Sequence, residues 1–304
     1  MNEDVVRTVN LHKHFGKTKA LAGLSINITE QSITGLVGRN GSGKTTLLKI
    51  LAGILDKTSG ELQVFGAEPM DNLPVLNRLI YAYHNMSYHS SFIESSQKLD
   101  TILAAYKTMF TNFDEVFAYK LLKYFELNSK TRYSYLSQGM SSTFNFICAL
   151  SCRADLTMLD EPVLGMDVTV RKSVYEILLR DFSEHPRTFI ISSHLLSEIE
   201  GLLSDVLLIE KGKAVLHGPI SDIQQSAYRV DGSHKAVQSF IVGKRTIAKR
   251  ISDVSSFAVI YEPLSNSVSE SVSSQGLTVS PVRAEDLCMY LTLQDKEDEL
   301  ACLW

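Results

Sequence analysis

The fold is decided by the stretch Gly38-Arg39-Asn40-Gly41-Ser42-Gly43-Lys44-Thr45. It follows the apolar run 33–37 and precedes the helix-like sequence 47–51. This is the phosphate-binding pattern GxxxxGK followed by Ser or Thr, in the strand–loop–helix context that it requires. Its glycines let the backbone bend around a phosphate, and the helix N-terminus adds a partial positive charge. A P-loop that binds a nucleoside triphosphate is therefore predicted here.

The side chains of this loop have different predicted tasks. Lys44 is expected to place its charge between the β- and γ-phosphates, and Thr45 to offer its hydroxyl to Mg²⁺. A glycine-rich turn without a ligand is the competing interpretation, and the flanking strand and helix patterns argue against it. The predicted nucleotide contacts are Gly38, Asn40, Gly41, Ser42, Gly43, Lys44, Thr45 and Thr46.

A second signal is the apolar run 156–159, which ends in the carboxylates Asp160 and Glu161. In a P-loop nucleotidase the first carboxylate at such a strand end holds Mg²⁺ through its waters, and the second polarises the attacking water. Acidic pairs also occur at strand ends without this chemistry, but the P-loop upstream favours the functional interpretation. Asp160 is therefore a predicted metal residue and Glu161 a predicted catalytic residue.

Outward from these motifs, residues 5 to about 223 alternate β-rich runs with helical stretches. Apolar residues recur at three- and four-residue steps in 99–110 and 115–125, which predicts a helical subdomain over about 72–152. The pattern is typical of an α/β domain, here a P-loop nucleotidase core with a mostly parallel sheet. Strands are predicted at 33–37, 156–160, 188–192 and 206–210.

The pattern of predicted strands and helices changes after Gly218-Pro219. A short helix is predicted at about 221–227, followed by β-like runs at 239–242 and 257–261 and a Ser-rich stretch at 265–274. We therefore expect a nucleotide-binding domain over residues 1–225 and a small α+β accessory domain over residues 226–304.

Composition excludes several classes of protein. The chain has 304 residues and a formal net charge of −4. This charge lacks the basic excess that nucleic-acid binding needs, so a nucleic-acid partner is not expected. No apolar stretch approaches the ~20 residues needed to span a bilayer, and residues 1–10 hold no signal-peptide core. The four cysteines show no CxxC spacing, so we expect reduced thiols that pack in the interior. A cytoplasmic protein is expected.

In this order, over residues 5 to about 222, the motifs resemble the ATP-binding-cassette (ABC) ATPase family. That family adds a signature motif, usually LSGGQ, which opens a helix and caps the γ-phosphate bound by the opposite subunit. The matching segment here is Leu136-Ser137-Gln138-Gly139-Met140. The resemblance implies phosphate contacts from Ser137 and Gly139, whereas Gln138 and Met140 depart from the usual pattern. It also fits an expected antiparallel β part near the N-terminus.

Further segments are similar to loops of the same family. Asp167 matches the D-loop, and His194 matches the switch histidine that reaches the γ-phosphate and the attacking water. Phe15 matches the aromatic residue that stacks on adenine, with a core phenylalanine as the alternative. The family's Q-loop glutamine, which touches Mg²⁺ and the membrane partner, falls at Asn85. Because this side chain is one methylene shorter, water would bridge the gap.

The resemblance implies that each ATP lies between the P-loop of one subunit and the signature motif of another. The chain is therefore expected to pair with a second nucleotide-binding subunit, identical or related. An integral-membrane transporter subunit would hold it at the inner face of the cell membrane. The tail 283–292 looks like the C-terminal helix of drug and peptide exporters, so export of a peptide, antibiotic or lipid-like compound is expected. Import of a small solute and a P-loop phosphotransferase are the alternatives.

Overall fold

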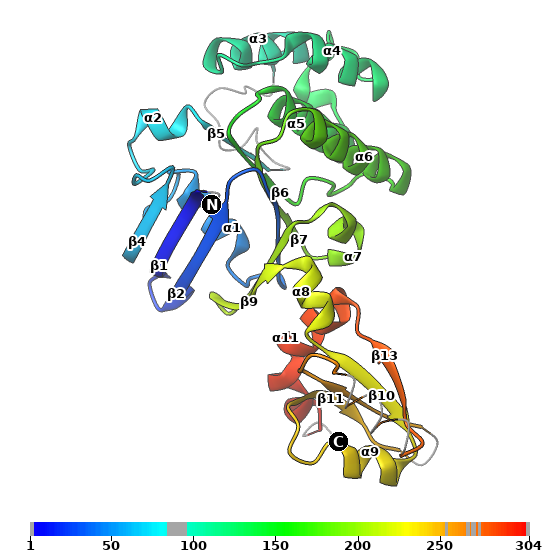
Figure 1. Cartoon of the computed structure of the whole chain (residues 1–304). Coiled ribbons are helices and arrows are strands. Elements are labelled where there is room, and N and C mark those ends of the chain that lie inside the picture. The colour runs from blue at the N-terminus through cyan, green and yellow to red at the C-terminus, as the bar shows by residue number, and fades with distance from the viewer. Residues whose placement is uncertain are drawn as a thin grey trace. The chain divides into compact units, whose positions relative to one another are not determined.

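The computed structural model describes residues 3–83, 96–252, 255–265, 268, 272 and 275–301. The chain forms two compact units, which Figure 1 draws together. The first unit comprises Met1–His194 and Gly201–His217, and the second comprises Leu195–Glu200 and Gly218–Trp304. Within the described residues, no helix is both long and apolar enough to cross a membrane.

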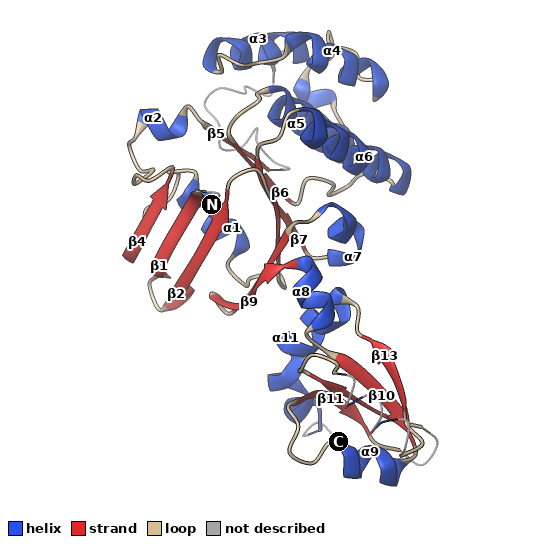
Figure 2. Cartoon of the chain, viewed as in Figure 1, coloured by secondary structure: helices blue, strands red, loops and turns tan. Residues whose placement is uncertain are grey.

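The first unit begins with an antiparallel sheet. Its strands are β1 (Asp4–Phe15), β2 (Thr18–Thr29) and β4 (Ser59–Val64), arranged in the order β2-β1-β4. Alternate residues of β2, such as Leu24, Ile26 and Ile28, are buried, as expected for a sheet that packs one face on the core. The predicted antiparallel N-terminal part is therefore confirmed (Figure 2).

A six-stranded sheet forms the centre of the first unit, in the order β5-β6-β7-β3-β8-β9. Each of the pairs β5–β6, β6–β7, β7–β3 and β3–β8 is parallel. Every residue of β3, β6 and β7 is buried, which is typical of parallel strands covered on both faces. The mostly parallel core sheet is confirmed. Its strands are β3 (Ile33–Val37), β5 (Leu79–Tyr83), β6 (Leu156–Asp160), β7 (Thr188–Ser193), β8 (Asp205–Glu210) and β9 (Lys213–Pro219).

Helices interrupt and follow the strands of this unit. Four of them begin at side-chain caps: Asn72 caps α2, Asp114 caps α4, Ser137 caps α5 and Asp167 caps α6, each accepting a backbone N–H three residues on. The predicted helical insertion is confirmed by α2 to α5. The helices are α1 (Lys44–Leu51), α2 (Leu73–Leu76), α3 (Leu99–Met109), α4 (Glu115–Tyr124), α5 (Gln138–Ser151) and α6 (Val168–Glu184).

The second unit holds a four-stranded antiparallel sheet in the order β11-β12-β10-β13. This order, with its first strand between the third and fourth, belongs to the split βαβ pattern. Its core includes Tyr228, Val230, Val237, Phe240 and Ile260. The elements are α7 (Leu196–Ile199), α8 (Ile220–Gln225), β10 (Tyr228–Gly232), α9 (His234–Phe240), β11 (Thr246–Arg250), β12 (Ser256–Ile260), β13 (Thr278–Pro281) and α11 (Ala284–Ala301).

One predicted element of this unit is wrong. Residues 239–242 were expected to be β-like, but they form the end of α9 and a turn. Ser233 caps α9 through a hydrogen bond from the backbone N–H of Ala236, and the three-residue step from Val237 to Phe240 places both side chains in the core. Helical packing therefore overrides the strand preference of this Ser-Phe-Ile-Val segment.

Candidate nucleotide site

The P-loop connects β3 to α1 at the carboxyl ends of the parallel strands. Two of its glycines lie too close to backbone for any side chain. A Cβ atom on Gly38 would lie 2.3 Å from the Ile209 carbonyl oxygen, and one on Gly43 would lie 2.6 Å from the Ala20 carbonyl oxygen. Gly43 also has a φ of 116°, in the left-handed region that disfavours other residues. Packing and conformation thus require these glycines.

Lys44 opens α1 and is only 6% exposed. Its Nζ atom donates hydrogen bonds to the carbonyl oxygens of Gly38, at 2.6 Å, and Arg39, at 3.3 Å. Burial lowers the pKa of Lys44, while the nearby charges of Glu161 and Asp160 raise it. The ammonium group therefore lies inside the loop, where it and the first N–H groups of the helix could bind the same anion.

Ser42 adds a second polar group to this cradle. Among the described residues, no group hydrogen-bonds to its Oγ atom, which is buried. A buried hydroxyl without a partner costs free energy, and a phosphate oxygen would satisfy it. The loop therefore fits an anionic ligand.

Asp160 ends β6 and carries the densest hydrogen-bond network of the site. Its Oδ2 atom accepts hydrogen bonds from Thr45 Oγ1 at 2.8 Å and from the Tyr81 hydroxyl at 3.0 Å. Its Oδ1 atom accepts one from Ser192 Oγ. A carboxylate beside a threonine hydroxyl is a set of hard oxygen donors, which suits Mg²⁺. The residues present therefore fit the predicted metal.

Glu161 follows directly, outside the strand, with a positive φ of 50°. Its backbone N–H donates to Ser192 Oγ at 2.9 Å. The Oε2 atom of its side chain lies 2.8 Å from Nδ1 of His194, the first residue after β7. Both side chains remain partly exposed, at 22% for Glu161 and 47% for His194. The pair can therefore reach a ligand and a water molecule at the strand ends.

Phe15 ends β1 and pairs with Thr18 across the hairpin turn. Its side chain is 50% exposed, and Lys13 Nζ lies 5.1 Å from the centre of its ring. The neighbouring strand β2 reaches the P-loop, since the Ala20 carbonyl lies against Gly43. An aromatic ring that is half exposed near the phosphate loop is available for stacking on a base.

Ser137, Gly139 and Asp167 form a second group at the starts of α5 and α6. A Cβ atom on Gly139 would lie 2.6 Å from the Gly165 carbonyl oxygen, so the two segments are in close contact. Ser137 Oγ accepts a hydrogen bond from Met140 N at 3.3 Å, and Asp167 Oδ1 accepts one from Val170 N at 3.0 Å. No hydrogen bond among the described residues joins Ser137 or Gly139 to the P-loop.

Asn85 lies outside the described residues, so its predicted role stays a prediction. Two residues of the site were not predicted: Tyr81 and Ser192, which both donate to Asp160. The signal for Ser192 is the register of the sheet, because Ser192 pairs with Asp160 across β6 and β7. The signal for Tyr81 is the register between β5 and β6, because Tyr81 lies two residues before Tyr83, the residue that pairs with Asp160.

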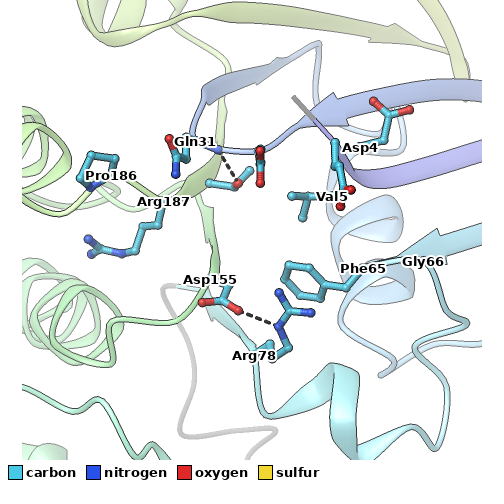
Figure 3. Close-up of a pocket in the computed structure, with 12 residues that line it drawn as sticks. Asp4, Val5, Gln31, Phe65, Gly66, Arg78, Asp155, Pro186 and Arg187 are labelled. Atoms are coloured by element: carbon cyan, nitrogen blue, oxygen red, sulfur yellow. Dashed lines mark hydrogen bonds and ion pairs between the residues drawn. The ribbon is translucent and has the colours of Figure 1, made fainter. Parts of the chain in front are cut away.

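A pocket of about 550 Å³ lies at the opposite, amino ends of the strands. Figure 3 shows its lining, which includes Arg78 before β5, Asp155 before β6 and Gln31 before β3. Arg78 Nε donates to Asp155 Oδ2 at 2.6 Å, and the guanidinium lies 3.8 Å from the centre of the Phe65 ring. The P-loop and Asp160 lie at the carboxyl ends, so this pocket is separate from the nucleotide site.

Comparison with known proteins places the chain in one family. The family model described as ABC transporter matches residues 21–164. An uncharacterized ABC transporter ATP-binding protein of Methanocaldococcus jannaschii is 34% identical over 72% of this chain and 79% of its own length. The bacitracin transport ATP-binding protein BcrA of Bacillus licheniformis is 29% identical, over 73% of this chain and 72% of its own. The zinc uptake system ATP-binding protein ZurA of Listeria innocua is 28% identical, over 68% and 83%.

A solved structure of the ATP-binding subunit of an ABC transporter matches the fold, with a TM-score of 0.62 at 19% identity. The match covers 72% of this chain and 92% of that chain. The predicted fold class is therefore confirmed by an independent structure. From the family model, the Methanocaldococcus relative and this fold, we conclude that the chain belongs to the ABC transporter family, as an ATP-binding subunit that hydrolyses ATP.

Proposed function

We propose that the chain powers export of a peptide, antibiotic or lipid-like compound through a separate membrane-spanning subunit. The similarity to the bacitracin transport protein BcrA supports the class of compound, and the likeness of the tail 283–292 to the C-terminal helix of drug and peptide exporters supports the direction. In this proposal the membrane-spanning subunit would hold this chain at the inner face of the cell membrane.

The first unit binds ATP through the P-loop in this proposal. Backbone N–H groups, Ser42 and Lys44 hold the phosphates, with further contacts from Asn40 and Thr46, and the Phe15 ring stacks on the adenine. Thr45 and Asp160 would hold Mg²⁺, directly or through water, and Asn85 would add a contact that lies outside the described residues. When bound, the metal neutralises phosphate charge. Support comes from the buried ammonium of Lys44 and the hydroxyl–carboxylate contact between Thr45 and Asp160.

Hydrolysis uses Glu161 and His194. Glu161 takes a proton from a water molecule, whose oxygen attacks the γ-phosphorus, and the bond from that phosphorus to the ADP oxygen breaks. His194, held by the 2.8 Å contact between its Nδ1 and Glu161 Oε2, orients the water and the γ-phosphate through its other ring nitrogen. A general base of this kind contributes about a hundred- to ten-thousandfold in rate.

Each ATP site is shared between two nucleotide-binding subunits in this proposal. Ser137, Gly139 and Asp167 of one subunit face the nucleotide held by the other. Ser137 lies at the start of α5 and Asp167 at the start of α6, where helix N-termini present N–H groups to a phosphate. The second unit, which contains residues 226–304, acts as the accessory domain that we expect there.

Transport itself tests the direction. The membrane subunit is first identified by copurification with this chain, and the two are then co-expressed. Inside-out membrane vesicles from these cells receive ATP in the external buffer together with labelled bacitracin or Zn²⁺. Export predicts ATP-dependent accumulation of the peptide inside these vesicles, and none with Glu161→Gln. Accumulation of the labelled solute only in right-side-out vesicles that hold ATP inside would favour import, which the similarity to ZurA keeps as the second candidate.

A further inference from the structure

Asp160 is held by three hydroxyl groups from three different elements. Thr45 Oγ1 comes from α1 and the Tyr81 hydroxyl from β5, and both donate to Oδ2, at 2.8 and 3.0 Å. Ser192 Oγ comes from β7 and donates to Oδ1. Hydrogen bonds to an ionised acceptor are about twice as strong as neutral ones, so these three contacts set the orientation of the carboxylate.

The Tyr81 contact follows from the pleat of the parallel sheet. Tyr83 pairs with Asp160 across β5 and β6, so Tyr81, two residues earlier, shares its face of the sheet. The Tyr81 ring stacks on Tyr83, with 5.1 Å between ring centres, and is buried in the core with Met158. The Tyr81 hydroxyl carries a proton and the carboxylate oxygen can only accept, so the hydroxyl donates this hydrogen bond.

The other two donors have further tasks. Thr45 offers the hydroxyl whose oxygen would bind the metal through a lone pair, in addition to the hydrogen bond that it donates to Asp160. Ser192 Oγ also accepts the backbone N–H of Glu161, so it positions two residues at once. Tyr81 is 7% exposed and reaches Asp160 from inside the core, where its ring is fixed by packing.

We propose that Tyr81 is a positioning residue for the metal-dependent binding of ATP, which it supports by holding Oδ2 of Asp160 in place from inside the core. The inference rests on the proposed function, in which Asp160 helps to hold Mg²⁺. Tyr81 acts only through Asp160 and touches neither nucleotide nor metal.

The test compares ATP binding with Mg²⁺ and with EDTA in the unaltered full-length chain, Tyr81→Phe and the control Tyr133→Phe. Tyr133 is also buried, and its hydroxyl lies 3.1 Å from Oδ1 of Asn145, so the control loses one buried hydrogen bond away from Asp160. Tyr81→Phe is expected to weaken binding of ATP with Mg²⁺ about tenfold and to leave binding in EDTA within about twofold. Tyr133→Phe should change neither, while thermal melting checks that both variants are folded.

A double variant separates action through Asp160 from a general effect on packing. If Tyr81 works through Asp160, then Tyr81→Phe should add nothing to the loss of Mg²⁺-dependent binding caused by Asp160→Asn. Additive losses, or equal losses with Mg²⁺ and with EDTA, would overturn the inference alone. An unaltered chain that binds ATP equally well with and without Mg²⁺ would overturn the proposed metal role of Asp160, and this inference with it.

Discussion

Nδ1 of His194 lies 2.8 Å from Oε2 of Glu161, so the residue after β7 and the residue after β6 form one pair. The pair stands at the carboxyl ends of neighbouring parallel strands, on the edge of the sheet that also carries the P-loop. Because Glu161 has a left-handed backbone conformation, its side chain leaves the strand direction followed by Asp160. In the function proposed above, metal binding and proton transfer therefore fall to different carboxylates.

Glu161→Gln should bind ATP as tightly as the unaltered chain and hydrolyse it about a hundred- to ten-thousandfold more slowly, since glutamine keeps size but cannot accept the proton. Phosphate release and size-exclusion chromatography with ATP and Mg²⁺ measure both properties. Blocked hydrolysis should let a closed dimer accumulate. Turnover at the unaltered rate would rule out the base, and a slow variant that stays monomeric would indicate a different cassette subunit as the partner.

Lys44→Ala should abolish ATP binding and hydrolysis without unfolding the chain. The lysine contributes a point charge to the phosphates, and its burial already lowers its pKa, so the fold gains little from the charge. Lys49→Ala, in the last turn of the same helix, is the matched control and should keep both activities. Isothermal titration with ATP and thermal melting are the measurements. Hydrolysis retained by Lys44→Ala would contradict the assignment of the P-loop.

Gln138 and Gly165 should be coupled in stability. A Cβ atom on Gly165 would lie 2.9 Å from Gln138 Cγ, and Gly165 has a φ of 80°. Gly66 has a φ of 78° and open space around it, so Gly66→Ala carries the backbone strain alone. Gly165→Ala should therefore lower the free energy of unfolding by about 1 kcal/mol more than Gly66→Ala.

The same urea unfolding experiments, repeated with Gln138→Ala, isolate the contact. In that background most of the extra cost of Gly165→Ala should disappear, since Cγ is gone and only the Cβ atom, at 3.3 Å, remains close. An unchanged extra cost would show that Gln138, which stands where the family's signature usually has glycine, does not pack on the D-loop segment.

Residues placed by local signals could be predicted from the sequence, whereas those placed by long-range register could not. Lys44 belongs to a motif whose spacing reflects the geometry of a loop around a phosphate, and Glu161 directly follows an apolar strand. Both residues could therefore be recognised from the local sequence. Tyr81 looked like any aromatic residue of a buried strand, because its meaning depends on which strand lies beside β5. The strand predicted at 239–242 is wrong because Val237 and Phe240 lie three residues apart on one face of a helix, and both pack in the core.

The segment 195–200 is a further case of long-range placement. It follows His194 directly, yet it belongs to the second unit, where α7 packs against α11. Gln224 Nε2 donates to Glu200 Oε1 at 2.6 Å, and Leu196 and Ile199 are at most 1% exposed. No local pattern in 195–200 predicts that residues some 90 positions later cover it, a separation that follows from the bounds of α11.

A chain that ends at residue 225 should keep ATP binding, because the P-loop and Asp160 lie in the first unit, and compact units fold with few contacts across their links. It should hydrolyse ATP about tenfold more slowly, since loss of α11 uncovers α7 and loosens the chain immediately after His194. Phosphate release and ATP titration measure the two effects.

The decisive comparison adds His194→Ala to both the truncated and the full-length chain. If truncation acts through His194, the substitution should cost the truncated chain less than the full-length chain. Equal costs in both chains would show that the second unit does not support the histidine, and loss of ATP binding on truncation would show that the first unit depends on it for folding.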